Sequence, residues 1–359
     1  MKVKLTDVCT PKQWKTISTN ELLEKGYPVY GANGLIGHYS EYNHEQPVVT
    51  ITCRGATCGA VNVTVPKSYV NGNAMCLDNL CPNVLLHYLY YCLLHYDFSH
   101  VISGSAQPQI TRQGLEKVEI EVCSIEQQII IVDSLRKIEA VITARQQQLH
   151  KLDELVKARF VEMFGDPVDN SKNFSLVPLG QLGVLKRGVS KHRPRNDAIL
   201  LGGKYPLIQT GDVSNAKDYI TEYTSTYSEE GLKQSKMWSK GTLCITIAAN
   251  IADTAILAFD ACFPDSVVGF IPNEKVTTLF IHNWFKFLQP ILEENAPAVA
   301  QKNLNVATLE KTNVIVPPID LQKEFELFVH QLDKSKFVVQ QALEKAQLLF
   351  DSLMQQYFG

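Results

Sequence analysis

The chain has 359 residues, of which 45% are hydrophobic and 20% charged, and its formal net charge at pH 7 is -3. This length is enough for about two domains with a hydrophobic core each, and the composition is that of a soluble globular protein. The acidic balance excludes a uniformly basic binder of nucleic acid, so any such contact requires a local basic patch or the help of partners.

The first part of the chain predicts a mixed α/β module that ends in one long helix. Short strand-like runs, broken by Gly, Asn and Pro, occupy residues 28–31, 48–52, 60–65 and 118–122. A helix-like segment occupies 84–95. The long helix follows, because one apolar residue recurs every seven positions, without Pro or Gly before Gly165: Leu135, Ile142, Leu149, Val156 and Met163.

The second part of the chain repeats this plan. Strand-like runs occupy residues 243–247, 254–259 and 267–271. One helix-like segment occupies residues 279–292. Pro317-Pro318 predicts a firm start for a second long helix. The apolar row of this helix is interrupted at Lys336.

The two halves are related in sequence. Residues 106–122 read AQPQITRQGLEKVEIEV and residues 300–316 read AQKNLNVATLEKTNVIV, so a fixed shift of 194 positions aligns Ala106 with Ala300. The same shift keeps register without a gap from about residue 49 to 165. This indicates a tandem duplication.

The predicted fold class is therefore α+β, with two mixed modules and two long helices. The modules are expected at 1–122 and 166–316, and the helices at 123–165 and 317–359. Two apolar seams in one chain are expected to pack on each other as an antiparallel coiled coil, which would give the repeat a pseudo-two-fold symmetry. A helix of roughly 36 residues is about 54 Å long, a length that duplex DNA covers in about 16 base pairs.

This order of segments resembles the specificity subunit of Type I restriction-modification systems. VEIEVCSIEQQIIIV and NVIVPPIDLQKEFEL lead into the helices, and KARFVEMFGDP closes the first, as in that family. YPVYGANGLIGHY, ITCRGATCGAV and YPLIQTGDVSN resemble segments of its target-recognition domains. The resemblance covers essentially the whole chain, although CSIEQQ departs from the proline-rich lead-in that PPIDLQ retains.

The resemblance implies a DNA-sequence specificity subunit that is not itself an enzyme. Each target-recognition domain would read one half of a bipartite site in double-stranded DNA, and two methyltransferase (modification) subunits and restriction/translocase subunits would carry the catalysis. S-adenosylmethionine, ATP and magnesium are expected on those partners, with no cofactor or metal in this chain. The sequence agrees, because it lacks an N-P-P-[FY] loop for a flipped adenine and a G-x-x-x-x-G-K-[ST] phosphate loop.

A cytoplasmic protein without membrane contact is expected, since neither a secretory signal nor a membrane-spanning run is visible. The nine cysteines do not indicate a disulfide framework in a chain of this length. Cys53-x4-Cys58 and Cys76-x4-Cys81 could supply four thiolates to zinc. Their spacing is wider than in C-x2-C sites and their neighbours are strand-like, so buried thiols are the preferred interpretation.

The strongest electrostatic signal is the basic segment, residues 186–195 (KRGVSKHRPR), with five formal positive charges. Gly and Pro predict a loop, from which side chains can reach phosphates or base edges. A solvated surface loop is the alternative. The candidate DNA contacts of this segment are Lys186, Arg187, Lys191, His192, Arg193 and Arg195.

Further candidates lie on turns and near the ends of the modules. Those of the first module are Arg54, Tyr30, Asn33 and His38. Asn33 could read adenine, but a turn-forming role is the preferred interpretation for it. Gln209, Thr210 and Asp212 are weaker candidates of the second module. Gln107 and Gln301 recur before the last strand of each module, where either DNA contact or a repeated structural hydrogen bond would explain them.

The alternative function is a non-catalytic coiled-coil adaptor whose two globular modules bind protein partners. The basic segment separates the two hypotheses. A DNA-binding protein loses affinity as salt rises when such charges contact phosphates, whereas an adaptor has no such DNA binding to lose.

Overall fold

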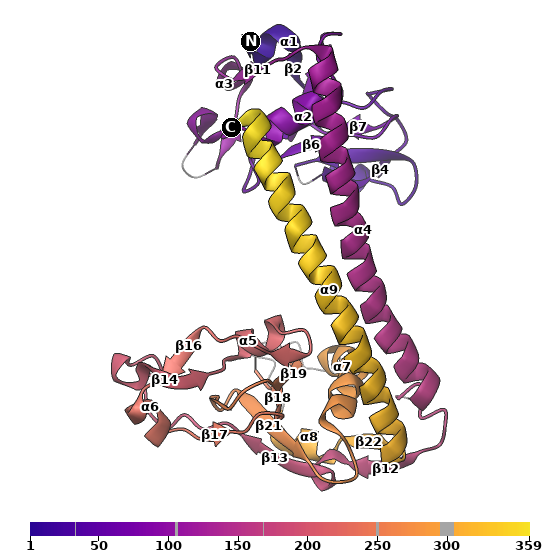
Figure 1. Ribbon diagram of the computed structural model, residues 1–359. Helices are drawn as coiled ribbons and strands as arrows, with labels where there is room; N and C mark the ends of the chain where they lie inside the picture. Colours follow the sequence, from indigo (N-terminus) through magenta and orange to yellow (C-terminus); the bar gives the residue numbers. More distant parts are fainter. Residues whose placement is uncertain (33, 105–106, 168, 249–250, 295–304) are drawn as a thin grey trace. The chain divides into compact units, whose positions relative to one another are not determined.

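The computed structural model describes residues 1–32, 34–104, 107–167, 169–248, 251–294 and 305–359. The chain divides into two compact units: the first unit is Met1–Gln147 with Val339–Gly359, and the second unit is Gln148–Val338. Each unit therefore contains one α/β module and a part of each long helix (Figure 1). The predicted domain boundaries at 122, 165 and 316 stay predictions, because they divide the chain by element and the units divide it by packing.

The first module is built on two small sheets. An antiparallel sheet has the order β2-β8-β5-β6, with bounds Thr10–Gln13, Ala74–Asp78, Val49–Thr52 and Val61–Val63. A second sheet has the order β4-β3-β7, with bounds Gly34–Tyr39, Tyr27–Gly31 and Tyr69–Val70. The predicted strands 28–31, 48–52 and 60–65 are thereby confirmed as β3, β5 and β6.

The remaining elements of the first module connect these sheets to the long helix. The helices are α1 (Leu5–Val8), α2 (Leu86–His95) and α3 (Arg112–Leu115), with 3-10 turns at Thr19–Glu21 and Ser99–Val101. The strand pairs are β1 (Lys2–Lys4) with β11 (Glu119–Glu121) and β9 (Ile102–Ser103) with β10 (Gln109–Ile110). One core joins Ile51 and Met75 of the sheet to Leu89 of α2 and Leu135 of the long helix.

The second module has the larger sheets. A five-stranded sheet has the order β13-β21-β18-β19-β15, with bounds Gly183–Arg187, Val267–Pro272, Leu243–Thr246, Thr254–Leu257 and Tyr219–Ile220. A four-stranded sheet has the order β16-β14-β20-β17, with bounds Ser225–Tyr227, Leu201–Leu207, Ala261–Cys262 and Met237–Trp238. Its helices are α5 (Thr210–Asn215), α6 (Glu229–Lys233), α7 (Thr278–Glu294) and α8 (Val306–Lys311), with 3-10 turns at Leu179–Gln181 and Ala198–Leu200.

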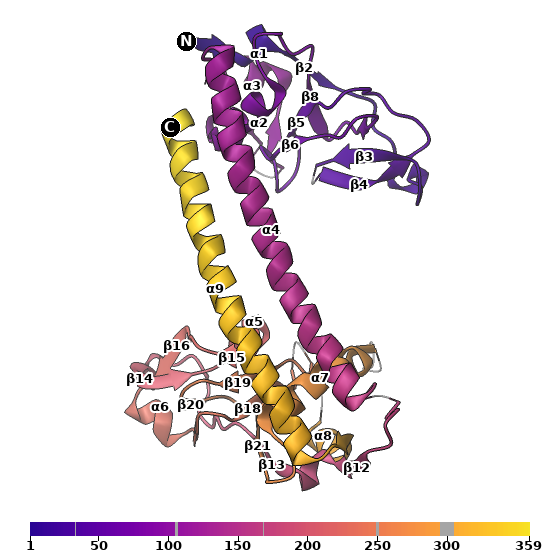
Figure 2. The same cartoon turned by 45° about the vertical axis from the view of Figure 1, so that its right-hand side comes forward.

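The two predicted long helices are confirmed as α4 (Ile125–Phe164) and α9 (Ile319–Phe358), each of 40 residues. Gly165, with a φ of 74°, ends α4 in the left-handed conformation that favours glycine. In the second unit the ring centroids of Phe160 and Phe325 are 5.5 Å apart, and further along Asp153 contacts Lys336. The two helices therefore run antiparallel there, and Figure 2 shows α4 beside α9 in the same unit.

Each module closes on itself before its chain enters a long helix. In the first module β1 pairs antiparallel with β11, so that Lys2 is opposite Glu121. In the second module β12 (Ser175–Pro178) pairs in the same way with β22 (Asn313–Val316). The repeat seen in the sequence is thus a repeat of structure: β5 and β18 occupy positions that differ by the predicted shift.

A buried glutamine ties the first module to the start of α4. The side chain of Gln128 is fully buried. Its Oε1 accepts the backbone N–H of Leu85, directly before α2, at 2.8 Å. Its Nε2 donates to the carbonyl oxygens of Asn83 and Cys123, both at 2.9 Å. One amide thus satisfies three backbone groups that would otherwise be buried without partners.

The same joint is present in the second unit. Gln322, also fully buried, lies three positions inside α9 and aligns with Gln128. Its Oε1 accepts the N–H of Thr277, directly before α7, at 2.9 Å. Its Nε2 donates to the carbonyls of Lys275 (3.0 Å) and Pro317 (2.9 Å). Gln128 and Gln322 therefore have the same structural role, each in its own copy of the repeat.

Helix α2 of the first module and helix α7 of the second make contacts of different chemistry. In the first unit Tyr88 and Tyr91 of α2 pack against Phe358 and Phe350 of α9. Tyr91 also donates its hydroxyl hydrogen bond to Glu139 of α4. The interface is mainly aromatic and apolar, and burial raises the pKa values of both tyrosines above their usual range.

In the second unit α7 carries a buried histidine. Nε2 of His282 is 3.0 Å from a carboxylate oxygen of Asp218, and Nδ1 is 2.9 Å from Oγ1 of Thr254. A carboxylate accepts, so Nε2 carries the proton and the Thr254 hydroxyl donates to Nδ1. Burial lowers the pKa of His282, which is therefore a neutral donor, and Lys286 is a cation that donates a hydrogen bond to Asp218.

We expect Gln128→Met to lower the free energy of unfolding by about 2–4 kcal/mol, because it leaves one N–H and two carbonyls buried without partners. The matched control is Gln127→Met, since Gln127 is exposed on the next position of the same helix. This control should change stability by less than about 0.5 kcal/mol. Urea denaturation of both variants makes the comparison, and equal midpoints would contradict the structural role of Gln128.

A pH dependence follows from His282. Its pKa is lower in the folded chain than in the unfolded chain, so below about pH 6.5 the unfolded state binds more protons and stability is lost as pH falls. Asp218 does not contribute in this window: burial raises its pKa, but His282 and Lys286 outweigh burial and hold it far below the usual range.

We expect the wild-type free energy of unfolding to fall by on the order of 1 kcal/mol more than that of His282→Gln between pH 7 and pH 5.5. Glutamine can donate to Asp218 and accept from Thr254 but does not titrate. Thermal unfolding of both proteins at the two pH values measures the difference. Parallel losses in the two proteins would show that His282 does not titrate in this way.

Candidate nucleic-acid interface

The basic segment lies partly on a strand and partly on a loop. Lys186 and Arg187 are exposed at the end of β13, where Arg187 is opposite Val268 of β21. The prediction of a loop is therefore wrong for these two residues, because the antiparallel pairing with β21 continues through Arg187. The loop begins at Gly188. A residue with a side chain does not fit at this position, because its Cβ would lie 2.2 Å from the carbonyl oxygen of Phe263.

Hydrogen bonds of Gln234, outside the loop, and of Arg193, within it, hold the backbone of the loop in the basic segment. Oε1 of Gln234 accepts the backbone N–H groups of Lys191 (2.7 Å) and His192 (3.1 Å). Arg193 donates from Nη1 to the carbonyl oxygens of Ser190 (2.7 Å) and His192 (2.8 Å). These hydrogen bonds define the backbone path, so the Cα positions from which the exposed side chains extend are fixed.

The two loop arginines share one carboxylate. Nη2 of Arg193 is 3.5 Å from Asp265, and Arg195 donates to the other oxygen of the same side chain. His192 pairs separately with Asp197 at 3.0 Å. The backbone N–H of Ile199, together with His192, lowers the pKa of Asp197, which stays ionised. Part of the positive charge of the segment is thus balanced locally.

Three cations of the segment have no acidic partner in the described part of the chain: Lys186, Arg187 and Lys191. All three are exposed. Cations in this condition lose little when they bind a phosphate, because no existing ion pair must be broken. They differ in this respect from Arg193 and Arg195.

Arg195 also lies at a hollow of about 340 Å³ on the second module. Gln209 and Thr210, predicted separately as candidates, line the same hollow, together with Ser225 and Ser266. Nε2 of Gln209 donates to Oγ of Ser225 at 3.3 Å. The structure therefore brings together candidates from two distant segments around one polar opening. Asp212 has a different role, because it accepts the N–H of Gln209 at 2.7 Å in the first turn of α5.

In the first module the structure joins Arg54 to the segment that contains Gln107. Arg54 forms an antiparallel bridge with Gln109, and the N–H of Gly55 donates to Pro108 at 3.1 Å. Arg54, Gln107 and Gln109 are all exposed. The polar segment from Gln107 to Gln109 therefore borders the turn of Arg54.

The other candidates of the first module are less accessible. Tyr30 lies half-buried in β3, and its hydroxyl accepts the N–H of Val65 at 3.3 Å. His38 is half-buried in β4, opposite Pro28. Asn33 and Gln301 lie outside the described residues.

Sequence reasoning missed two residues that shape this surface. Gln234 is 43 positions from Lys191, and Asp265 is 70 positions from Arg195. Neither residue belongs to a sequence motif. Each becomes a partner of the basic segment only because the folded chain brings distant strands and loops together. A lone acidic residue just before β21 was the only available signal for Asp265.

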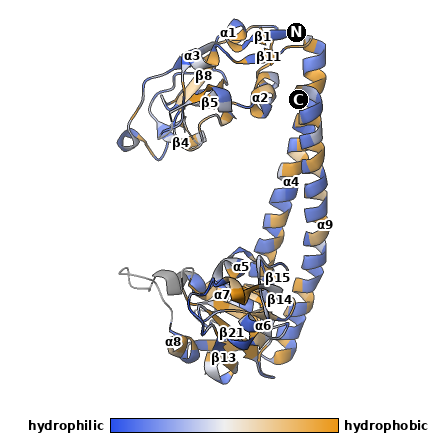
Figure 3. Cartoon of the chain, turned by 90° about the vertical axis from the view of Figure 1, so that its left-hand side faces the viewer, coloured by the Kyte–Doolittle hydropathy of each residue, from blue (hydrophilic) through white to orange (hydrophobic). Residues whose placement is uncertain are grey.

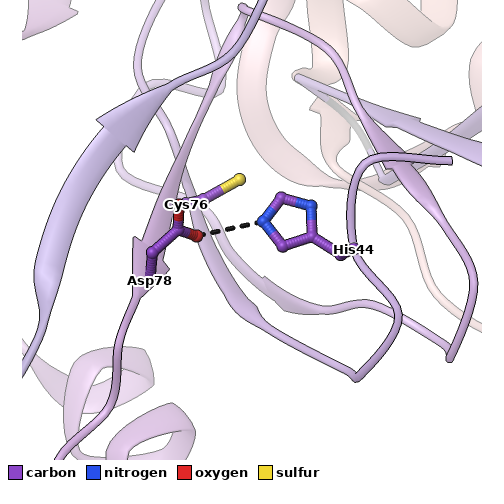
Figure 4. Close-up of side chains that lie close together, drawn as sticks. All are labelled: His44, Cys76 and Asp78. Atoms are coloured by element: carbon purple, nitrogen blue, oxygen red, sulfur yellow. Dashed lines mark hydrogen bonds and ion pairs between the residues drawn. The ribbon is translucent and has the colours of Figure 1, made fainter.

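The cysteine pairs considered as zinc ligands do not form a four-thiol group among the described residues. The group of potential ligands within 4.8 Å of one another is instead His44, Cys76 and Asp78 (Figure 4). Burial raises the pKa of the Cys76 thiol well above its usual value, which disfavours the thiolate that a metal requires.

Hydrogen bonds account for the other two members of this group. Nε2 of His44 is 3.0 Å from one oxygen of Asp78, and the indole N–H of Trp14 donates to the other at 3.2 Å. Nδ1 of His44 is 2.7 Å from Oδ1 of Asn43, which also accepts the N–H of Val70. Both ring nitrogens thus face acceptors, so this group ties the loop of His44 to β8 and we assign no metal to it.

Two α/β modules that each close on themselves and lead into a long helix, with a basic surface on the second, define a duplicated, helix-linked binding protein. The chain belongs to the family of Type I restriction modification DNA specificity domains, which it matches over residues 1–154 and again over 172–347. The predicted resemblance and the predicted fold class are thereby confirmed.

Relatives of known name agree. The chain is 21% identical to a type I restriction enzyme specificity subunit of Haemophilus influenzae, over 96% of this chain and 89% of that protein. It is 27% identical to the EcoprrI specificity subunit of Escherichia coli over a shorter region, 37% of this chain and 34% of that protein.

Solved structures share the fold. The crystal structure of the S subunit of a Type I restriction-modification system from M. genitalium has a TM-score of 0.65 at 15% identity, covering 100% of this chain and 96% of that one. A chain from a structure on assembly and conformational transition of the type I system has a TM-score of 0.54 at 13% identity, covering 100% and 97%. Of the helices in the described part of this chain, none combines the length and apolar character needed to cross a bilayer.

Proposed function

We propose that this chain selects the DNA sequence for a Type I restriction-modification complex and has no catalytic site of its own. Each module, as a target-recognition domain, reads one half of a bipartite site in double-stranded DNA. The long helices set the separation of the half-sites and dock two methyltransferase subunits. Restriction/translocase subunits join the same complex, and S-adenosylmethionine, ATP and magnesium bind to the partners.

The observation that carries this proposal is the family match over both repeats, since two recognition domains in one chain fit two half-sites. The electrostatics of the second module support it. Lys186, Arg187 and Lys191 are exposed and without acidic partners in the described structure, as expected for contacts to phosphates.

Base reading in the second module is assigned to the hollow beside the basic segment. The guanidinium of Arg195, held by Asp265, presents a fixed fork that suits the N7 and O6 atoms of guanine. The amide of Gln209 suits the N6 and N7 atoms of adenine. A side chain held in advance loses less conformational entropy on binding and tolerates fewer alternative bases.

In the first module the corresponding surface is the turn of Arg54 with Gln107 and Gln109. All three side chains are exposed and lie on two segments that are bridged through the backbone. One cation beside two amides can contact a phosphate and base edges at the same time. Tyr30 and His38, which are half-buried in the second sheet of this module, are further candidates for DNA contact.

Docking of the partners is supported by apolar side chains that the long helices expose. Figure 3 shows hydrophobic residues distributed among hydrophilic ones along both helices. Apolar side chains on the surface can enter the apolar core of a protein–protein interface. The large hydrophobic residues exposed on α4 and α9 are Ile129, Ile130, Val141, Leu155, Val161, Leu327, Phe337, Val338, Leu348 and Leu349.

Reconstitution with the modification subunits encoded beside this chain tests the function. We expect the assembled complex to methylate adenines in a site made of two specific parts with a fixed gap, and the chain alone to methylate nothing. Exchange of residues 170–310 for those of a relative should change one part of the site and leave the other unchanged. Methylation of a contiguous motif, or unchanged specificity after the exchange, would refute bipartite reading.

Two substitutions in the basic segment should have different effects. We expect Lys191→Ala to weaken binding to all DNA sequences alike and to lower the salt dependence of log K by about 0.9, the value for one phosphate contact. Arg195→Ala should instead cost about 1–3 kcal/mol on the cognate site and little on other sequences, because it removes a base contact.

Fluorescence anisotropy with the assembled complex, at several salt concentrations and on cognate and scrambled duplexes, measures both effects. Lys217→Ala, an exposed lysine outside the basic segment, is the control for the loss of one positive charge. The assignment fails if Arg195→Ala and Lys191→Ala change cognate and scrambled binding in the same proportion. A protein adaptor would bind neither duplex.

A further inference from the structure

Lys336 is a charged residue in an apolar row of α9. The residue aligned with it in the first repeat is Ile142 of α4, which keeps the apolar pattern. The side chain of Lys336 is 16% exposed, so most of it has been removed from water. A lysine in this condition requires acidic partners, since an unpaired buried charge is costly.

The partners of Lys336 belong to three different elements. Nζ is 2.7 Å from Oδ1 of Asp153 on α4 and 3.9 Å from Asp333, one turn earlier on α9. It is also 3.9 Å from Oδ2 of Asp218, which the module contributes from the loop between α5 and β15. One ammonium group therefore contacts both long helices and the module of the second unit.

Asp218 extends this cluster into the module. Its Oδ1 accepts from Nε2 of His282 and from Nζ of Lys286, both on α7, and its side chain is 14% exposed. Loss of Lys336 would leave Asp218 with these two donors. The contact from Lys336 is thus not needed to neutralise the carboxylate, and its particular contribution is the connection to α9 and Asp153.

The aligned positions of the first repeat carry a different chemistry. Tyr88, Cys92 and Ile142 align with His282, Lys286 and Lys336. There the module meets the helices through aromatic rings, such as Tyr91 against Phe350. Apolar contacts change little when two surfaces slide slightly, whereas an ion pair with several partners is satisfied in one arrangement.

We propose that Lys336 is a positioning residue that fixes the register of α9 against α4 and the seating of the second module on both. This inference rests on the proposed function, because the seating of a recognition module determines which gap between half-sites the complex accepts. A complex with the cluster intact accepts one gap length. A complex without it accepts neighbouring lengths as well.

The experiment compares Lys336→Ile with Lys336→Arg and wild type, each as the full chain assembled with its methyltransferase subunits. Lys336→Ile installs the residue of the first repeat, and Lys336→Arg keeps the charge. The substrates are duplexes with the wild-type gap and with gaps one base pair longer or shorter. The measured quantity is the ratio of methylation rates on the wild-type gap and on the altered gaps.

We expect Lys336→Ile to lower the unfolding temperature moderately, because it removes the cation and leaves the carboxylates of Asp153, Asp218 and Asp333 close together. Its discrimination between gaps should fall by about fivefold or more, as for a coupling of about 1 kcal/mol. Lys336→Arg should keep the wild-type ratio. Amide hydrogen exchange at residues 216–220 should be faster in Lys336→Ile and unchanged in the first module.

Wild-type discrimination in Lys336→Ile would overturn the proposal. So would a lower unfolding temperature in Lys336→Ile together with an equal loss of rate on every gap, since that pattern shows a purely stabilising ion pair. Failure of the proposed function is distinguishable, because the wild-type complex would then methylate no bipartite site at all.

Discussion

The architecture of this chain depends on a buried side-chain amide at the start of each long helix. Gln128 and Gln322 each hold three backbone groups that come from two places: the approach to α2 or α7 and the entry to the long helix. Without such a joint, a module followed by a helix of 40 residues could pivot at the connection. With it, the backbone direction at the end of the module determines that of the helix.

The long-range organisation could be predicted from the sequence because it is repeated. The shift of 194 positions, the heptad rows and the prolines at 317 and 318 are local or periodic signals, and they identified both long helices and the strands that became β5 and β18. Periodicity reports which face of an element is buried, and this requires no knowledge of the partner.

The candidate nucleic-acid interface could be predicted from the sequence only in part. The charge of the basic segment was visible. Its division into the paired Arg193 and Arg195 and the cations without an acidic partner in the described structure depends on Asp265, which approaches only when β13 and β21 pair. For the same reason Gln209 and Arg195 were separate candidates in the sequence and neighbours in the structure. Lys336 was visible as an irregularity, and the structure explains it by the carboxylates of Asp153, Asp218 and Asp333 around its ammonium group.

The closure of each module by its own first and last strands has a consequence for the history of such chains. Ser175 lies opposite Val316, so the polypeptide enters and leaves the second module at one place. A segment whose ends are adjacent can be replaced as a block by recombination without threading through the remaining protein. The glutamine joint makes this easier, because it recognises only main-chain atoms of the incoming block and imposes no demand on its side chains. New specificities can therefore be acquired by exchange of whole modules on an unchanged helical frame.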